Sequence, residues 1–147
     1  MTVNTKRVFY VKYLADPLFA EILTARPEVR LNKLENHSPE AEAAPVLAAA
    51  HAYQIGSARD ELDLSYHAHR DLLARAPNLL VVSTNGAGYD TVRVEDCTKA
   101  GVLVVNQAGG NSEAVAEHVL GMMLCLSKRI IETDRTMRRA PAIERNL

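Results

Sequence analysis

Residues 79–106, LLVVSTNGAGYDTVRVEDCTKAGVLVVN, contain two continuous apolar runs separated by a more polar stretch. The runs Leu79–Thr84 and Val102–Asn106 have the composition of parallel strands that are covered on both faces. Between them, Thr91–Ala100 is predicted to form a helix, and Gly101 stands where a C-terminal cap favours a left-handed residue. The stretch therefore predicts a strand, helix and strand, with both strands in the centre of a parallel sheet.

The residues before this unit repeat the same alternation of strand and helix. Val8–Tyr13 is β-branched and aromatic, and Asp16-Pro17 is typical of an N-cap followed by proline at the first helical position. Four further elements are predicted from periodicity and punctuation: an edge strand at Val29–Leu34, a helix at Ala41–Ala52 with Pro45 in its first turn, a short strand at Tyr53–Ser57, and an amphipathic helix at Leu64–Ala76. Five strands separated by helices predict a doubly wound α/β sheet with the flavodoxin-like arrangement.

Three loops that contain glycine follow the last three predicted strands. They are Gly56-Ser57, Asn85–Tyr89 and Gln107–Asn111. Open α/β sheets bind ligands outside the carboxyl ends of their strands. Glycine lets backbone N–H groups face a small anion such as a carboxylate without a side chain in the way. The alternative is that these glycines only permit tight turns, and for any one loop taken alone this is the better explanation.

The segment after the third loop is predicted to be a helix that is apolar over a wide arc. Asn111 or Ser112 can cap it, and Glu113 suits its first turn. Two stripes of apolar residues follow the helical period: Val115, Val119, Met122, Met123, Leu126 and Ile130, then Ala116, Leu120 and Leu124. The sheet domain is too small to cover such a helix. We therefore expect a homodimer through residues 112–129, or a further domain packed on them.

The segment Asn78–Arg129 resembles the D-isomer-specific 2-hydroxyacid dehydrogenase family, which includes phosphoglycerate, glycerate, D-lactate, formate and phosphite dehydrogenases. GAGYD at residues 86–90 is similar to the GxGxD loop of the family. NSEAVAEH at residues 111–118 is similar to the N-x-x-x-VAEH start of a family helix. The two motifs are independent and lie at the mutual spacing that the family shows.

The resemblance implies a domain organisation and an activity. Residues 1–106 would be a flavodoxin-like substrate-binding domain, and residues 107–147 a hinge and the first helix of an incomplete Rossmann domain. The complete enzyme would bind NAD or NADP. It would transfer a hydride between the nicotinamide and C2 of a D-2-hydroxy or 2-oxo acid.

The resemblance also assigns roles to individual residues. Substrate binding is carried over to five residues: Gly56, Ser57, Ala87, Gly88 and Asn111. Contact with the nicotinamide end of the cofactor is carried over to Ala87 and Val115. The residues around the GxGxD loop depart from those that members often show, with Ser83-Thr84-Asn85 before it and Thr91 after it. Which acid is bound is therefore open.

The catalytic part of the family pattern does not occur in this sequence. The dinucleotide fingerprint GxGxxG and the family's catalytic arginine, glutamate and histidine lie beyond the VAEH helix, and GAGYDT lacks the third glycine. We therefore predict that the chain is truncated before the Rossmann domain and is inactive. By itself it should contain no catalytic residue and bind no NAD(P). The alternative is a non-enzymatic module that binds a carboxylate or associates with itself.

The remaining candidate residues have structural interpretations. His118 is expected to make a structural hydrogen bond in a mostly buried helix, and Asp90 to stabilise the start of the following helix. His67 and His69 would point to different sides of a helix, so both are interpreted as surface residues and no metal site is predicted. The two cysteines, Cys97 and Cys125, are expected to be buried, reduced thiols.

Composition excludes several other classes of protein. The chain has 147 residues and a net charge of −1, so no basic surface indicates nucleic acid or an anionic membrane as a partner. No segment has the roughly 20 apolar residues of a spanning helix, and no signal peptide is evident. The sequence is therefore interpreted as a soluble, cytoplasmic protein with a small-molecule ligand.

Overall fold

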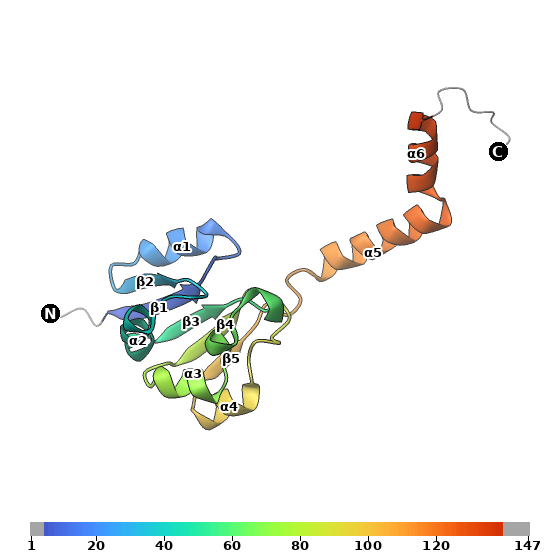
Figure 1. The fold of residues 1–147 in the computed structure, drawn as a ribbon. Helices are drawn as coiled ribbons and strands as arrows, with labels where there is room; N and C mark the ends of the chain where they lie inside the picture. Colours follow the sequence, from blue (N-terminus) through green and yellow to red (C-terminus); the bar gives the residue numbers. More distant parts are fainter. Residues whose placement is uncertain (1–4, 140–147) are drawn as a thin grey trace. The chain divides into compact units, whose positions relative to one another are not determined.

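The computed structural model describes residues 5–139 and contains two compact units, Met1–Gly110 and Asn111–Leu147. The first unit alternates strands and helices, and the second contains two helices (Figure 1). Each unit is described by itself below. Within residues 5–139, no helix combines the length and the apolar character needed to cross a bilayer.

The first unit contains five strands, four α-helices and two short 3-10 helices. The strands are β1 (Lys6–Val11), β2 (Val29–Leu34), β3 (Ala52–Ile55), β4 (Val81–Thr84) and β5 (Leu103–Val105). The helices are α1 (Pro17–Thr24), α2 (Glu40–Ala49), η1 (Arg59–Glu61), η2 (Leu64–Tyr66), α3 (Arg70–Arg75) and α4 (Val94–Lys99).

All strand pairs are parallel, and the order across the sheet is β2-β1-β3-β4-β5. This order confirms the doubly wound, flavodoxin-like prediction. It also confirms that β2 is an edge strand, with the predicted bounds. The prediction for β5 was wrong, because β5 is the opposite edge strand and the side chain of Leu103 is 61% exposed.

The two faces of the sheet are covered unequally. Helices α2, α3 and α4 lie on one face, and α1 lies on the other (Figure 1). The face under the three helices carries the buried core, in which Phe9 stacks on Tyr53 with ring centroids 4.0 Å apart. On the opposite face, Leu103 and Val105 of β5 remain exposed. The apolar run Val102–Asn106, which was predicted to be covered on both faces, is thus covered on one face only in this unit.

Local sequence signals account for several element boundaries. The Asp16 side chain accepts a hydrogen bond from Leu18 N–H, with Pro17 at the first helical position, as predicted. Gly101 follows the C-cap of α4 with a φ of 73°, which confirms the predicted glycine cap. Pro45 lies in the second turn of α2, counted from Glu40, so its predicted place in the first turn was wrong.

The predicted helix Leu64–Ala76 is interrupted. Residues 64–66 form η2, and α3 begins only at Arg70. Between them the chain is extended, because Ala68 N–H donates to Thr91 O and Arg93 N–H donates to Ala68 O, in a parallel bridge of Ala68 with Val92. The same bridge keeps residues 91–93 out of a helix, so α4 begins three residues later than predicted.

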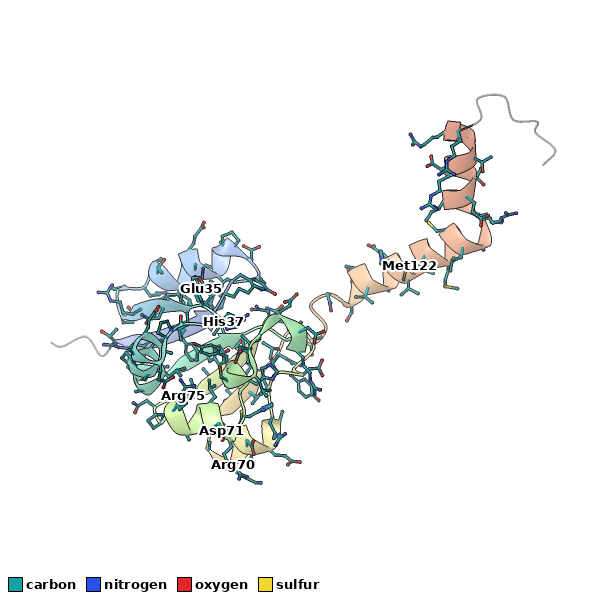
Figure 2. All side chains as sticks on the ribbon, viewed as in Figure 1. Glu35, His37, Arg70, Asp71, Arg75 and Met122 are labelled. Carbon is teal, nitrogen blue, oxygen red and sulfur yellow. The ribbon has the colours of Figure 1, made fainter. Side chains whose placement is uncertain are left out.

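The second unit consists of α5 (Ser112–Ser127) and α6 (Ile130–Arg139), joined at Arg129, whose φ is 51°. Neither helix contains a buried residue. Apolar side chains project from α5, Met122 among them (Figure 2), and Leu126 is 80% exposed. Within this unit the two helices therefore do not cover the apolar stripes that the sequence predicted.

Candidate functional site

The carboxyl ends of β3 and β4 carry two of the predicted loops, and the structure brings them into contact. A Cβ atom built on Gly88 would lie 3.6 Å from Ser57 Cβ, and one built on Gly86 would lie 3.7 Å from Ser57 Oγ. These are ordinary van der Waals distances, so Ser57 rests directly on the GAG segment. Four of the five residues predicted to bind substrate, Gly56, Ser57, Ala87 and Gly88, therefore lie on two adjoining loops.

Backbone carbonyl groups of the GAGYD loop are hydrogen-bonded to the protein. Gly86 O accepts from Thr84 Oγ1 at 2.9 Å and from Gln107 N–H at 3.0 Å. Ala87 O accepts from Asn106 Nδ2 at 2.9 Å. The loop after β4 is thus held by the end of its own strand and by the residues that follow β5.

These carbonyl bonds determine where the neighbouring N–H groups point. In a planar trans peptide, the C=O of one residue and the N–H of the next point in opposite directions, and the described residues contain no cis peptide. The carbonyl bonds at Gly86 and Ala87 therefore turn the N–H groups of Ala87 and Gly88 away from the groups that those carbonyls bind. Neither N–H donates to any group in residues 5–139.

The loop after β3 is held in the same way. Gly56 O accepts a hydrogen bond of 2.6 Å from Thr91 Oγ1, and Thr91 is fully buried. The N–H of Ser57 therefore points away from Thr91, and within the described part of the chain it makes no hydrogen bond. Three unpaired backbone N–H groups on two adjoining glycine-containing loops are suited to bind a small anion.

A buried polar contact supports these loops from below. Gln54, only 6% exposed, donates from Nε2 to Asn85 Oδ1, and Asn85 N–H donates to Ile55 O. These bonds join the ends of β3 and β4 just before the loops begin. These hydrogen bonds therefore fix the strand ends from which the loops with the unpaired N–H groups begin.

The positively charged side chain of Arg59 lies beside the loops. Arg59 Nε donates to Asp90 O at 3.2 Å, which links the segment after β3 to the GAGYD loop. His69 is half-buried, and its burial, together with the charges of Arg93 and the neighbouring His67, lowers the pKa of its imidazole. The carboxyl edge therefore has the positive charge of Arg59 beside its loops, whereas the lowered pKa of His69 favours the neutral imidazole.

The other two predicted site residues belong to the second unit. Asn111 is the N-cap residue of α5, but its side chain makes no capping hydrogen bond. Val115 lies in the first turn of α5 and is 51% exposed. Their proposed roles toward substrate and nicotinamide remain predictions.

Several structural interpretations from the sequence need correction. His67 is 5% exposed, and its Nε2 lies 3.3 Å from Leu62 O, so it is not a surface residue. The neighbouring Ala68 pairs with Val92, a long-range contact that the sequence did not reveal. Asp90 does not cap α4, because the N-cap residue is Arg93. His118 is exposed on a helix without buried residues, and its imidazole makes no hydrogen bond within residues 5–139.

The structure also shows how far the two cysteines are buried and whether possible metal ligands cluster. Cys97 is buried and Cys125 is half-buried, and both are free thiols. Burial raises the pKa of the Cys97 thiol. The described residues contain no group of three or more His, Cys, Asp or Glu side chains that could hold a metal ion.

Sequence reasoning missed Asn106 and Arg59, and assigned Thr91 to a helix. Asn106 ends a predicted strand, and Arg59 follows a glycine-containing loop. Polar residues at the carboxyl ends of strands were a usable signal. Their partners, however, lie on loops from other strands, which the sequence does not pair.

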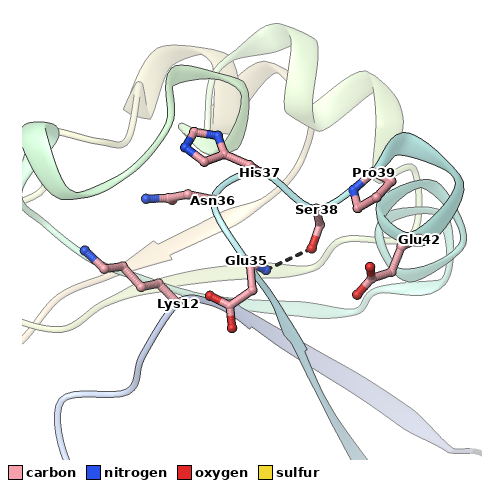
Figure 3. Close-up of a pocket in the computed structure, with 7 residues that line it drawn as sticks. All are labelled: Lys12, Glu35, Asn36, His37, Ser38, Pro39 and Glu42. Atoms are coloured by element: carbon pink, nitrogen blue, oxygen red, sulfur yellow. Dashed lines mark hydrogen bonds between the residues drawn. The ribbon is translucent and has the colours of Figure 1, made fainter.

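A separate cavity of about 470 Å³ lies at the carboxyl ends of β1 and β2 (Figure 3). Its lining residues are Lys12, Glu35, Asn36, His37, Ser38, Pro39 and Glu42. Glu35 N–H donates to Ser38 Oγ at 3.0 Å, and the Glu35 carboxylate pairs with Lys33. This cavity has no residue in common with the loops after β3 and β4.

Comparisons with known proteins agree with the fold and the motifs. The family model "D-isomer specific 2-hydroxyacid dehydrogenase, catalytic domain" matches residues 10–143. Glyoxylate reductase of Thermofilum pendens is 37% identical over 68 residues, which cover 46% of this chain and 20% of that protein. D-3-phosphoglycerate dehydrogenase of Mycobacterium leprae is 43% identical over 68 residues, which cover 46% of this chain and 13% of that protein. The match thus spans a fifth or less of these relatives.

Solved structures share the architecture. The PH0520 protein of Pyrococcus horikoshii is 25% identical with a TM-score of 0.67, over 91% of this chain and 37% of that one. D-lactate dehydrogenase of Aquifex aeolicus, solved in complex with NAD and lactic acid, is 24% identical with a TM-score of 0.67. That match covers 93% of this chain and 39% of the other. At this level of identity, the second likeness concerns the fold alone.

Proposed function

This chain belongs to the D-isomer-specific 2-hydroxyacid dehydrogenase family, and we propose that it forms the substrate-carboxylate side of an NAD(P)-dependent active site. In the complete enzyme, a hydride would pass between the nicotinamide and C2 of a D-2-hydroxy or 2-oxo acid. The loops of this chain would hold the carboxylate next to that carbon. Fixing the carboxylate places C2 in a defined position for transfer.

One observation carries the proposal: within residues 5–139 the N–H groups of Ser57, Ala87 and Gly88 are unpaired, and the carbonyls of the same peptide groups are hydrogen-bonded. Hydrogen bonds from N–H groups to an ionised carboxylate are stronger than bonds between neutral groups. Because the donors are already oriented, binding costs little reorganisation. Arg59 would add positive charge at the same edge.

We propose that this chain contributes few residues to the cofactor site. Ala87 and Val115 have compact apolar side chains that suit the border of a nicotinamide ring. The cofactor itself supplies the hydride chemistry when it is bound. The GAGYDT segment lacks the third glycine of a phosphate-binding fingerprint, so the residues present do not fit the pyrophosphate, and this chain should not bind NADH by itself.

Isothermal titration with glycolate, the smallest 2-hydroxy acid, tests the carboxylate site. We expect saturable binding with a dissociation constant on the order of millimolar, since two or three N–H donors provide a few kcal/mol. Glycolamide, which has the same shape without the charge, should bind much more weakly. Equal binding of the two, or none, would refute the proposed site. NADH fluorescence should show no saturation.

A second part of the proposal concerns self-association. The apolar residues of α5 are exposed, with Leu120 at 60% and Met123 at 61%. Apolar surface of this extent is seldom left open in a soluble protein. We propose that a second copy of the chain covers residues 112–129, which would give a homodimer. The alternative function, a non-enzymatic self-association module, would form the same dimer. Sedimentation velocity distinguishes a dimer from a monomer.

A further inference from the structure

Asn106 lies just after β5, and its side chain reaches the loop after β4. Its Nδ2 donates to Ala87 O at 2.9 Å. Within residues 5–139, Ala87 O accepts this one hydrogen bond, whereas Gly86 O accepts two. Within the described residues, the Asn106 side chain is therefore the one hydrogen-bonding group that holds the carbonyl of the peptide between Ala87 and Gly88.

The surrounding loop offers little else to hold that peptide. Ala87 and Gly88 are exposed, and a Cβ atom on Gly88 would contact only Ser57 within 4 Å. Rotation of the peptide plane would exchange the directions of Ala87 C=O and Gly88 N–H. An outward carbonyl would then present a partial negative charge where an anion should bind.

We propose that Asn106 is a positioning residue, which turns the Gly88 N–H toward the substrate carboxylate by holding Ala87 O on the opposite side of the peptide. The inference rests on the proposed carboxylate site and adds a residue that does not touch the ligand. Its role is to prevent a peptide rotation that would replace a donor with an acceptor.

A matched control lies near the amino end of β4, whereas Asn106 lies at the carboxyl end of β5. Asn78, which precedes β4, donates from Nδ2 to Ala48 O at 2.8 Å. Asn78 and Asn106 are both exposed. Asn78→Ala and Asn106→Ala therefore remove the same kind of hydrogen bond with a similar cost in stability. Only Asn106→Ala should affect the carboxylate site.

The experiment titrates glycolate into the 147-residue chain and the two variants, and records amide resonances by two-dimensional NMR. We expect Asn106→Ala to weaken glycolate binding about tenfold, the loss of one charge-assisted hydrogen bond. Asn78→Ala should stay within about twofold of the unsubstituted chain. In the absence of glycolate, the Gly88 amide resonance should move in Asn106→Ala and stay in place in Asn78→Ala.

The outcomes separate the two claims. If the unsubstituted chain binds glycolate and Asn106→Ala binds it equally well, the positioning role is refuted and the carboxylate site stands. If the unsubstituted chain does not bind glycolate, the proposed function fails. The positioning role is then decided by the ligand-free spectra: a shifted Gly88 amide in Asn106→Ala supports it, and an unchanged one overturns it.

Discussion

The sheet unit and the helical unit differ in how they treat apolar residues. In residues 5–110, strands and helices bury a continuous core that includes Phe9, Tyr53 and Val82. In residues 111–139, α5 and α6 have no buried residue, although α5 is apolar over a wide arc. The first unit covers its own apolar core, and we propose that a partner covers the apolar surface of the second. Stability and association should therefore respond to different substitutions.

The largest expected effect is on the core of the sheet unit. Phe9→Ala removes a fully buried ring that stacks on Tyr53, and should reduce the free energy of unfolding by about 3–5 kcal/mol. Met137→Ala, on α6 and outside residues 112–129, replaces a side chain that is 63% exposed and should change it by less than about 0.5 kcal/mol. Urea denaturation followed by circular dichroism measures both. Similar losses for the two variants would break the distinction between the units.

The next effect concerns association. A charge in the apolar surface of α5, as in Met123→Asp or Val119→Asp, should weaken self-association at least about tenfold, because burying an unpaired charge is costly. Helix content should change little. Glu117→Asp, at a charged position of the same helix, is the control. Sedimentation velocity over a range of concentrations measures the effect, and a monomer at all concentrations in the unsubstituted chain would contradict it.

A smaller effect comes from adding one methyl group to the ligand loop. Gly88→Ala should fold normally, because the new Cβ would lie 3.6 Å from Ser57 Cβ. The methyl group would crowd the open N–H groups and weaken glycolate binding several-fold, by about 1 kcal/mol. Gly121→Ala, the same substitution in α5, should leave glycolate binding unchanged. Calorimetric titration of both variants would show whether the ligand belongs to the sheet unit.

The smallest effect is a pH dependence of the sheet unit. The pKa of His69 is lowered by burial and by Arg93, so the folded state binds fewer protons than the unfolded state. Stability should therefore decrease as pH falls below about 6.5, the ordinary pKa of histidine. His69→Gln should reduce this dependence. Denaturation at several pH values measures this dependence. If stability changes with pH equally in the variant, His69 is not its cause.

Local patterns predicted much of the sheet unit. The alternation of strands and helices, the one-sided polarity of β2, the Asp16 cap and the Gly101 cap each follow from residues close in sequence. Elements that depend on distant contacts were not predictable in this way. The pairing of Ala68 with Val92 interrupts a segment whose periodicity is helical, and the neighbouring His67 is buried.

The candidate site divides along the same line. The glycine motif and the family resemblance indicated Ala87 and Gly88, because their motif is local. The side chains that hold the peptides, Asn106 and Thr91, reach loops after other strands. Their roles are visible only once strand order brings those loops together.

Amide mapping of glycolate on the 147-residue chain tests the central claim most directly. The account predicts saturable shifts of the Ser57, Ala87 and Gly88 amide resonances, and no shifts in residues 120–139. Shifts centred on the cavity around Lys12 and His37, or no saturable shift at these three amides, would contradict it.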